Sequence, residues 1–159
     1  GQHTIKLLAP NLLACSEHKE LLQQLIDSRA YIDFTQGLDI RLVNDSNFDL
    51  ICRCKVKMIH FAWDNPEERN IIEKFKSFKK LSGIDMRKLR VYVLTNFNST
   101  HEQDLYRVYK LKEMGYDPYI MVYNKESAPR ITRHLQRWVN NKYIFRSVDK
   151  FEDYLSRVG

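Results

Sequence analysis

The sequence predicts an α/β fold with a mostly parallel sheet of about five to six strands and flanking helices. Short runs of β-branched and aromatic residues alternate with stretches in which apolar residues recur at helical spacing. The strand-like runs begin near residues 4, 31, 56, 89 and 118, so roughly 25–35 residues separate them, the length of one strand–helix unit. Repeated units of this kind form parallel sheets with right-handed crossovers.

The predicted strands are apolar runs that end in polar residues. In the second run, Tyr31, Ile32 and Phe34 suit a pleated and packed surface, and Gly37 ends the run. A full eight-fold barrel needs about 250 residues, so the chain forms either an open doubly wound sheet or part of a barrel. We expect strands at 4–8, 31–36, 56–62, 89–95 and 118–123, with a sixth short strand at 143–146.

The predicted helices are bounded by capping residues and glycines. Ser16 can cap the first helix, and Asn65 with Pro66 is a typical start for the third, which Gly83 ends. Residues 99–102 read as a capping box that opens the fourth helix, and Gly115 ends it. The expected helices cover 16–29, 46–54, 66–82, 99–114, 129–140 and 149–158.

Length and composition bound the class of protein. The chain has 159 residues, of which 43% are hydrophobic and 29% charged, which predicts one α/β domain over 1–159. It contains no apolar run of membrane-spanning length and no signal-peptide pattern, so we expect a soluble, cytoplasmic protein without membrane partners. The formal net charge of +6 permits an anionic partner without requiring one.

Polar residues at the strand ends are the candidate ligand-binding set. The carboxyl ends of parallel strands meet at one rim, where such sheets bind ligands. Carboxylates, amides and one guanidinium there suit a polar ligand with a carboxylate and hydroxyls. The alternative is that Asn and Asp serve as turn and cap residues and that Asp39 and Arg41 only pair with each other. The candidates are Asn11, Gln36, Asp39, Arg41, Asp64, Asn65, Asn96, Asn98 and Asn124.

The sequence predicts no metal site and names no catalytic residue. Cys15, Cys52 and Cys54 are odd in number, which argues against a disulfide framework. Cys52 and Cys54 lie two apart on a predicted helix, and no second pair completes a tetrahedral site. No phosphate-binding glycine loop and no zinc-protease motif occurs. His60 is expected as a core or sheet-face residue.

The predicted helix at 129–140 carries a basic face. Arg130, Arg133 and Arg137 share one side of it, and Trp138 lies on the other. Together with the rest of the region 130–146, this face could bind a phosphate backbone or another acidic partner. The alternative, which we favour, is a solvated face on an amphipathic helix.

The order of these elements resembles the part of a radical SAM (S-adenosylmethionine) enzyme that follows the cluster-binding loop. The resemblance is carried by four strands and the residues at their ends. One strand runs into an amide residue and leucines, and another ends in an arginine after a short polar turn. Two further strands have polar ends. Residues 57–65 and 92–100 are also similar to a little-characterised bacterial subgroup of that family. The matching segments are 7–13, 37–41, 62–65 and 95–102.

The resemblance covers about residues 4–125 and implies the C-terminal part of a partial TIM-type (β/α) barrel. The family's C-x-x-x-C-x-x-C loop, which holds a 4Fe–4S cluster, is absent, and amide-rich turns replace its Gly-Ile-Glu and Gly-x-Pro motifs. The resemblance implies a parent enzyme that uses SAM and the cluster to abstract hydrogen from a substrate. An N-terminal part of that enzyme would complete the barrel. Arg41 is then the expected SAM contact, and the further cofactor contacts are Asp39, Asn11, Asp64 and Asn96. We expect the isolated chain to be inert and to hold no cofactor.

Overall fold

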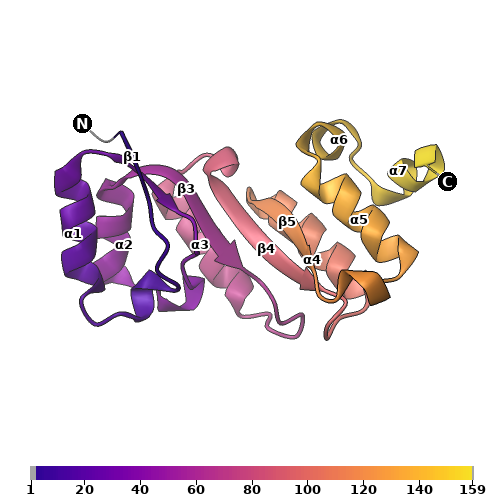
Figure 1. Cartoon of the computed structure of the whole chain (residues 1–159), viewed down its shortest axis with the longest axis horizontal. Helices are drawn as coiled ribbons and strands as arrows, with labels where there is room; N and C mark the ends of the chain where they lie inside the picture. The colour runs from indigo at the N-terminus through magenta and orange to yellow at the C-terminus, as the bar shows by residue number, and fades with distance from the viewer. Residues whose placement is uncertain (1–2, 159) are drawn as a thin grey trace.

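The computed structural model describes residues 3–158 and shows a five-stranded sheet in which every pairing is parallel (Figure 1). The strand order along the sheet equals the order along the chain. This confirms the predicted α/β class with five strands, and the described part of the chain shows no closed barrel. The strands are β1 (Thr4–Lys6), β2 (Tyr31–Phe34), β3 (Lys55–Ala62), β4 (Leu89–Thr95) and β5 (Asp117–Val122).

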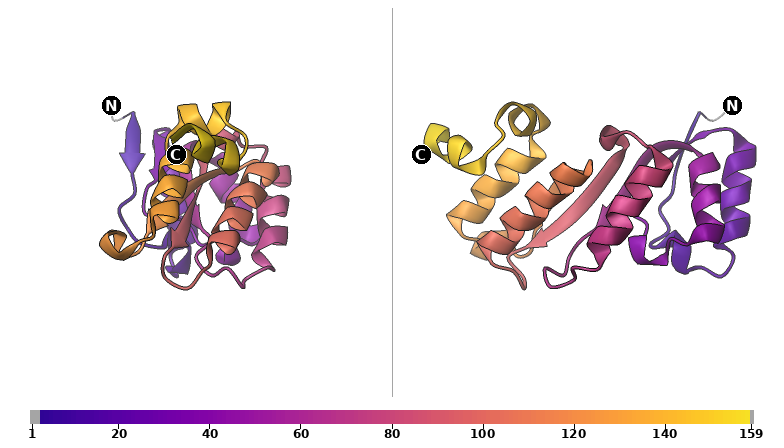
Figure 2. Two further views of the ribbon diagram at one scale, coloured as in Figure 1. Left: turned by 90° about the vertical axis from the view of Figure 1, so that its right-hand side faces the viewer. Right: turned by 180° about the vertical axis from the view of Figure 1, so that it is seen from behind.

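The first four α-helices cover one face of this sheet, and the C-terminal helices lie at its β5 edge, as Figure 2 shows from the side and from behind. Parallel neighbours in sequential order need crossovers of the same hand, which place successive helices on the same side. The helices are α1 (His18–Ser28), α2 (Asp45–Arg53), α3 (Ile71–Ser82), α4 (His101–Met114), α5 (Arg130–Asn140), α6 (Lys142–Ser147) and α7 (Phe151–Val158).

The prediction of a sixth strand at 143–146 was wrong, because these residues belong to the short helix α6. Tyr143, Ile144 and Phe145 favour strands by propensity. However, the Asn141 side chain caps the N–H of Ile144, and the Phe145 ring packs on Trp138 at 4.9 Å between centroids. Tertiary packing therefore overrides the local preference.

Several predicted helix boundaries were also displaced. The helix expected from Pro66 begins at Ile71, because the Asn65 side chain accepts the N–H of Glu67 and forms a turn instead of a cap. The predicted capping box lies one residue later, between Thr100 and Gln103. The first helix begins at residue 18 and not 16, and the first strand ends at residue 6 and not 8.

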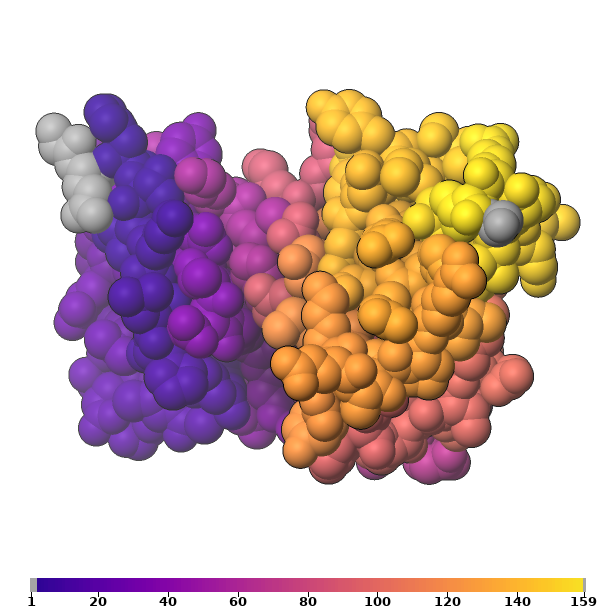
Figure 3. All heavy atoms as spheres, turned by 45° about the vertical axis from the view of Figure 1, so that its right-hand side comes forward, coloured from indigo at the N-terminus to yellow at the C-terminus, as the bar shows by residue number. Residues whose placement is uncertain are grey.

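The two faces of the sheet differ in burial. In β4, Leu89, Val91 and Val93 are fully buried against the helices, while the alternate residues Arg90 and Tyr92 are only partly buried. This alternation of side chains along a strand gives one face to the core and leaves the other open. Figure 3 shows the consequence: the surface is hollowed between the N-terminal segment and the C-terminal segments, and residues of the central strands form the floor.

The two outer edges of the sheet also differ. At β5 the Asn140 side chain accepts the N–H of Ile120 at 2.8 Å and donates to its carbonyl at 3.1 Å. Lys142 donates to the carbonyl of Pro118, which lies on the same edge and has no N–H to leave unpaired. Among the described residues β1 pairs with β2 alone. The β5 edge is therefore sealed by side chains, whereas the outer edge of β1 is bare.

No helix within residues 3–158 is both long and apolar enough to cross a membrane.

Candidate functional site

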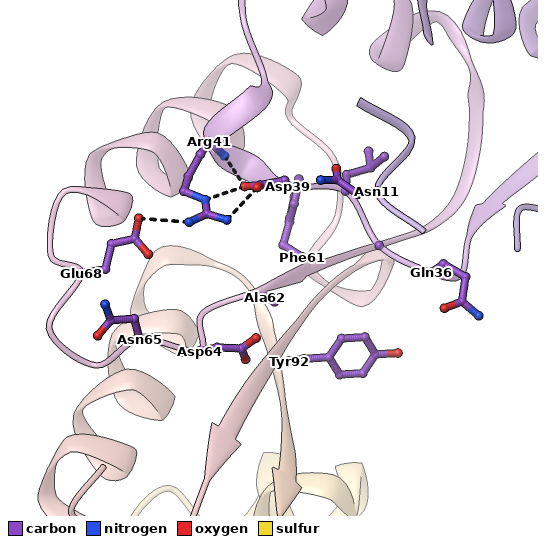
Figure 4. A pocket seen from close by; sticks show the side chains of 12 residues that line it. Asn11, Gln36, Asp39, Arg41, Phe61, Ala62, Asp64, Asn65, Glu68 and Tyr92 are labelled. Carbon is purple, nitrogen blue, oxygen red and sulfur yellow. Dashed lines mark hydrogen bonds and ion pairs between the residues drawn. The ribbon is translucent and has the colours of Figure 1, made fainter. Parts of the chain in front are cut away.

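A pocket of about 280 Å³ lies at the rim formed by the carboxyl ends of β1 to β4 (Figure 4). Its position is the one that ligands occupy in parallel α/β sheets. Four of the five residues predicted as cofactor contacts line it, together with side chains that the sequence did not single out. The lining residues are Asn11, Gln36, Gly37, Leu38, Asp39, Arg41, Phe61, Ala62, Asp64, Asn65, Glu68 and Tyr92.

The turn after β2 delivers Asp39 and Arg41 to this pocket. Gly37 has φ +89°, and a Cβ atom at this position would lie 3.2 Å from the carbonyl oxygen of His60. Glycine is required here because the chain must take a left-handed conformation close to the β3 backbone. The N–H of Leu38 then bonds to the same carbonyl at 2.8 Å, which fixes the turn against β3.

Arg41 is held by two carboxylates in the pocket. Its Nε and Nη2 atoms donate to the two oxygens of Asp39 at 2.8 and 2.7 Å, and Nη1 lies 3.8 Å from Glu68. The Arg41 hydrogen bond lowers the pKa of Asp39, and Asp39 raises the pKa of Arg41. Both the predicted ion pair and the predicted rim position are present. The Nε and Nη2 atoms of Arg41 already donate to Asp39, so only its remaining N–H groups are available to a ligand.

Asp64 is the third acidic group of the pocket, beside Asp39 and Glu68, and lies on the side opposite Gln36 in Figure 4. Desolvation raises the pKa of Asp64, against the lowering effects of a backbone hydrogen bond from Leu94 and of Arg107 and Arg41. An acceptor carboxylate of this kind can bind ligand hydroxyls, and it is not engaged in a salt bridge with any described residue.

The buried Arg107 of α4 fixes the backbone from which Asp64 projects. Its Nη1 donates to the carbonyls of Trp63 at 2.7 Å and Asp64 at 3.4 Å, and its Nη2 to the carbonyl of Leu94 at 2.9 Å. Nη2 also contacts Asp104 at 2.7 Å, and both side chains are almost fully buried. Sequence reasoning missed this residue. The signal was an Asp and an Arg three apart on the apolar face of a predicted helix.

Asn11 brings an unsatisfied acceptor to the pocket. Its backbone is left-handed, with φ 46°, and its Oδ1 atom is buried without a hydrogen-bond partner among the described residues. A buried polar atom without a partner costs free energy unless a ligand or water satisfies it. The Asn11 amide is therefore a candidate ligand contact.

Asn96 and Asn124 lie outside the pocket. Both adopt left-handed backbone conformations after strands β4 and β5, with φ 59° and 42°. The Asn96 amide donates to the carbonyl of Tyr123 at 2.9 Å and so joins the two loops. Their strand-end positions reflect the tolerance of asparagine for this conformation. Of the predicted cofactor contacts, Asn96 is thus the one that lies outside the rim pocket and serves a loop contact.

The cysteines are separated and free. Cys15 is exposed, Cys52 is half-buried and Cys54 is buried, and burial raises the pKa of Cys54 to about 11. Within residues 3–158 no three His, Cys, Asp or Glu side chains are grouped closely enough to hold a metal ion. The residues of this chain therefore do not fit a 4Fe–4S cluster.

The predicted basic face on α5 is present. Arg130, Arg133 and Arg137 line a hollow of about 230 Å³ with His134, whose Nε2 accepts from Arg130 at 3.2 Å. No carboxylate of the described residues lies within salt-bridge distance of these three arginines. The hollow is a separate feature from the rim pocket, since the two share no lining residue.

No protein-family model, curated protein or solved structure matches the chain.

Proposed function

We propose that this chain is the SAM- and substrate-lining part of a radical SAM-like enzyme. The parent would cleave SAM reductively and abstract hydrogen from its substrate, and a further part of the same protein would supply the cluster. The observation that carries the proposal is the rim pocket, in which residues that follow β1, β2 and β3 converge with Tyr92 of β4 at the edge used for ligands. The three free cysteines support a reducing, cytoplasmic setting.

The one-sided arrangement of helices supports this proposal. In a (β/α) barrel the helices lie outside a parallel sheet whose strands follow in sequential order. The five strands have that order, and their other face is open. The bare edge of β1 is where a further strand of the parent would pair. Since Asn140 and Lys142 occupy the β5 edge, the barrel would remain partial.

The pocket residues fit SAM, whereas the chain does not fit the cluster. The orphan acceptor of Asn11 and the carboxylate of Asp64 suit the ribose hydroxyls, and the outer N–H groups of Arg41 suit the SAM carboxylate. When bound, SAM supplies the group that abstracts hydrogen. The role of these residues is to bind and orient it, with Asp39 and Glu68 holding the Arg41 side chain.

The proposal is tested by titrating the ¹⁵N-labelled chain with S-adenosylhomocysteine, which cannot be cleaved. The side-chain amides of Asn11, Gln36 and Asn65 report directly on the pocket, and we expect their signals to shift together and saturate. Asp64→Ala should weaken binding about tenfold or more, because a hydrogen bond to a charged group contributes about 1.5–3 kcal/mol. Asp85→Ala, which removes an exposed acid paired with Arg87 outside this pocket, is the matched control.

Two results would contradict the proposal. One is the absence of shifts at the three rim amides at millimolar ligand, with the chain folded. The other comes from the encoding gene: the proposal requires a C-x-x-x-C-x-x-C segment upstream in the same reading frame, and a reading frame without one would exclude the radical SAM assignment.

A second candidate function is anion binding by α5. It rests on the arginine-lined hollow, in which Arg130, Arg133 and Arg137 have no described carboxylate partner. If the hollow binds nucleic acid, affinity should fall steeply with salt, and replacing Arg133 and Arg137 with alanine should flatten that dependence by about two phosphate contacts. Binding that is undetectable or independent of salt would leave a solvated helix face.

A further inference from the structure

The open face of the sheet carries a continuous aromatic cluster, of which only Tyr92 also lines the rim pocket. His60 and Tyr92 stack with centroids 5.2 Å apart and an interplanar angle of 11°. Tyr119 meets the edge of Tyr92 at 5.8 Å, and the guanidinium of Arg90 lies 5.2 Å from the Tyr119 ring centre. These side chains share the open face because Tyr92 pairs with Tyr119 and His60 with Arg90 in the strand register.

Burial favours the neutral form of His60 in this cluster. Its Nδ1 donates to the carbonyl of Phe34 at 3.1 Å, since a carbonyl can only accept, and burial lowers the pKa of His60. The Nε2 atom is therefore left as an acceptor. Neither the hydroxyl of Tyr92 nor that of Tyr119 has a hydrogen-bond partner among the described residues. The aromatic surface thus keeps free polar atoms on its rim.

Asp33 places an unsatisfied carboxylate oxygen beside this surface. It lies on β2 in register with Met58 of β3, and its Oδ1 is buried without a hydrogen-bond partner in the described part of the chain. The negative charge of Asp33 raises the pKa of His60 and that of Tyr92 through Coulombic interaction. A desolvated carboxylate oxygen of this kind requires a donor, and the N–H groups of a ligand can supply one.

The opposite end of the cluster carries excess positive charge. Asp117 contacts both Arg90 at 3.4 Å and Lys142 at 2.6 Å, so two cations face one carboxylate. The cluster therefore runs from an acceptor at β2, across aromatic rings, to a net cation at β5.

We infer that this open face binds a nucleotide through an amino-bearing nucleobase, and that this is the substrate class of the proposed enzyme. The base would stack on the tyrosines, its amino group would donate to Asp33, and its phosphate would lie toward Arg90, because the three N–H groups of Lys142 are already taken by Pro118, Val139 and Asp117. Stacking on aromatic residues of a sheet is a common way to hold a base, and carboxylates accept from exocyclic amines. The inference rests on the proposed function only in calling the nucleotide a substrate. The nucleotide site itself is argued from the open face of the sheet alone.

The test uses the full chain and the fluorescent probe 2-aminopurine riboside 5′-phosphate, whose emission is quenched by stacking. We expect Tyr119→Leu to weaken binding about tenfold, the size of one lost base–aromatic stack. Tyr143→Leu is the matched control, because Tyr143 is 91% exposed on α6 and lies outside the cluster. The affinity for the free nucleotide is compared with the affinity for a short single-stranded RNA that carries one 2-aminopurine. The tighter binder shows whether the site prefers a free nucleotide or a base within RNA.

Asp33→Asn provides a second variant that keeps the side-chain shape. The unmodified chain should bind adenosine 5′-phosphate more tightly than purine riboside 5′-phosphate, which lacks the amino group, and Asp33→Asn should reduce that preference about tenfold. The inference is overturned if Tyr119→Leu and Asp33→Asn both bind the probe as the unmodified chain does. It is also overturned if S-adenosylhomocysteine displaces the probe, because the face would then belong to the cofactor site.

The two proposals fail separately. If S-adenosylhomocysteine leaves the rim amides unshifted while the probe still depends on Tyr119 and Asp33, the nucleobase site stands and the radical SAM assignment falls. If the rim amides shift and the probe does not bind, the cofactor pocket stands and the substrate class is wrong.

Discussion

Replacing Arg107 with methionine should be among the most damaging single changes in this chain. The substitution keeps an unbranched apolar stem but leaves the Asp104 carboxylate buried without its cation, which typically costs about 3–5 kcal/mol. It also removes the donors to the carbonyls of Trp63 and Leu94. We expect about 4 kcal/mol of lost stability, a large share of the 5–15 kcal/mol typical of a domain, and a fall in Tm of about 8–16 °C.

The assay is urea unfolding followed by tryptophan fluorescence and circular dichroism. Arg107→Met combined with Asp104→Leu removes the stranded charge, so the double variant should be more stable than the sum of the two single losses predicts, by about 2 kcal/mol. Arg53→Met is the control: its 3.7 Å pair with Asp49 is exposed, and we expect a change below about 1 kcal/mol. A coupling near zero between Arg107 and Asp104 would refute the reasoning.

Three further outcomes are expected. Arg41→Lys should weaken S-adenosylhomocysteine binding about tenfold while Tm barely changes, because lysine cannot form the two parallel hydrogen bonds that hold Arg41 to Asp39. A lower Tm with unchanged affinity would show that Arg41 is a structural residue. Asp64→Asn should stabilise the fold at pH 7, because the folded-state pKa of Asp64 is raised and its charged form is disfavoured. That advantage should shrink in urea titrations as pH falls through the folded-state pKa of Asp64, and a difference independent of pH would contradict it. Iodoacetamide should label the exposed Cys15 first and Cys54 last, since burial raises the pKa of Cys54 to about 11, and equal rates by mass spectrometry would disagree.

The sheet could be predicted from the sequence because its signals are local and repeated. The runs around Ile32, Val91 and Ile120 carry strand propensity, and each is followed by an amphipathic stretch, so the parallel order follows from chain connectivity. The short helix α6 could not be predicted, whereas the last helix was expected at 149–158 and α7 is found at Phe151–Val158. Whether Tyr143 and Phe145 lie in a strand or a helix depends on packing against Trp138, which no local pattern contains.

The candidate site was predictable in part for the same reason. Asp39, Arg41 and Asp64 meet because strand ends converge, which topology alone implies. Asn96 followed the same pattern but serves a left-handed turn, and sequence cannot separate these roles of asparagine. Arg107 was missed because its partners are backbone carbonyls of distant strands, which carry no sequence signature.

The unequal edges of the sheet limit how copies of this chain can associate. Edge strands pair with one another when their backbone groups are free, and here that applies to β1, whereas Asn140 and Lys142 already occupy the β5 edge. A molecule with one unpaired strand edge can pair with only one other copy, because the pairing uses the free backbone groups of both edges. At high concentration the chain should therefore stop at two-fold pairs and not grow into filaments.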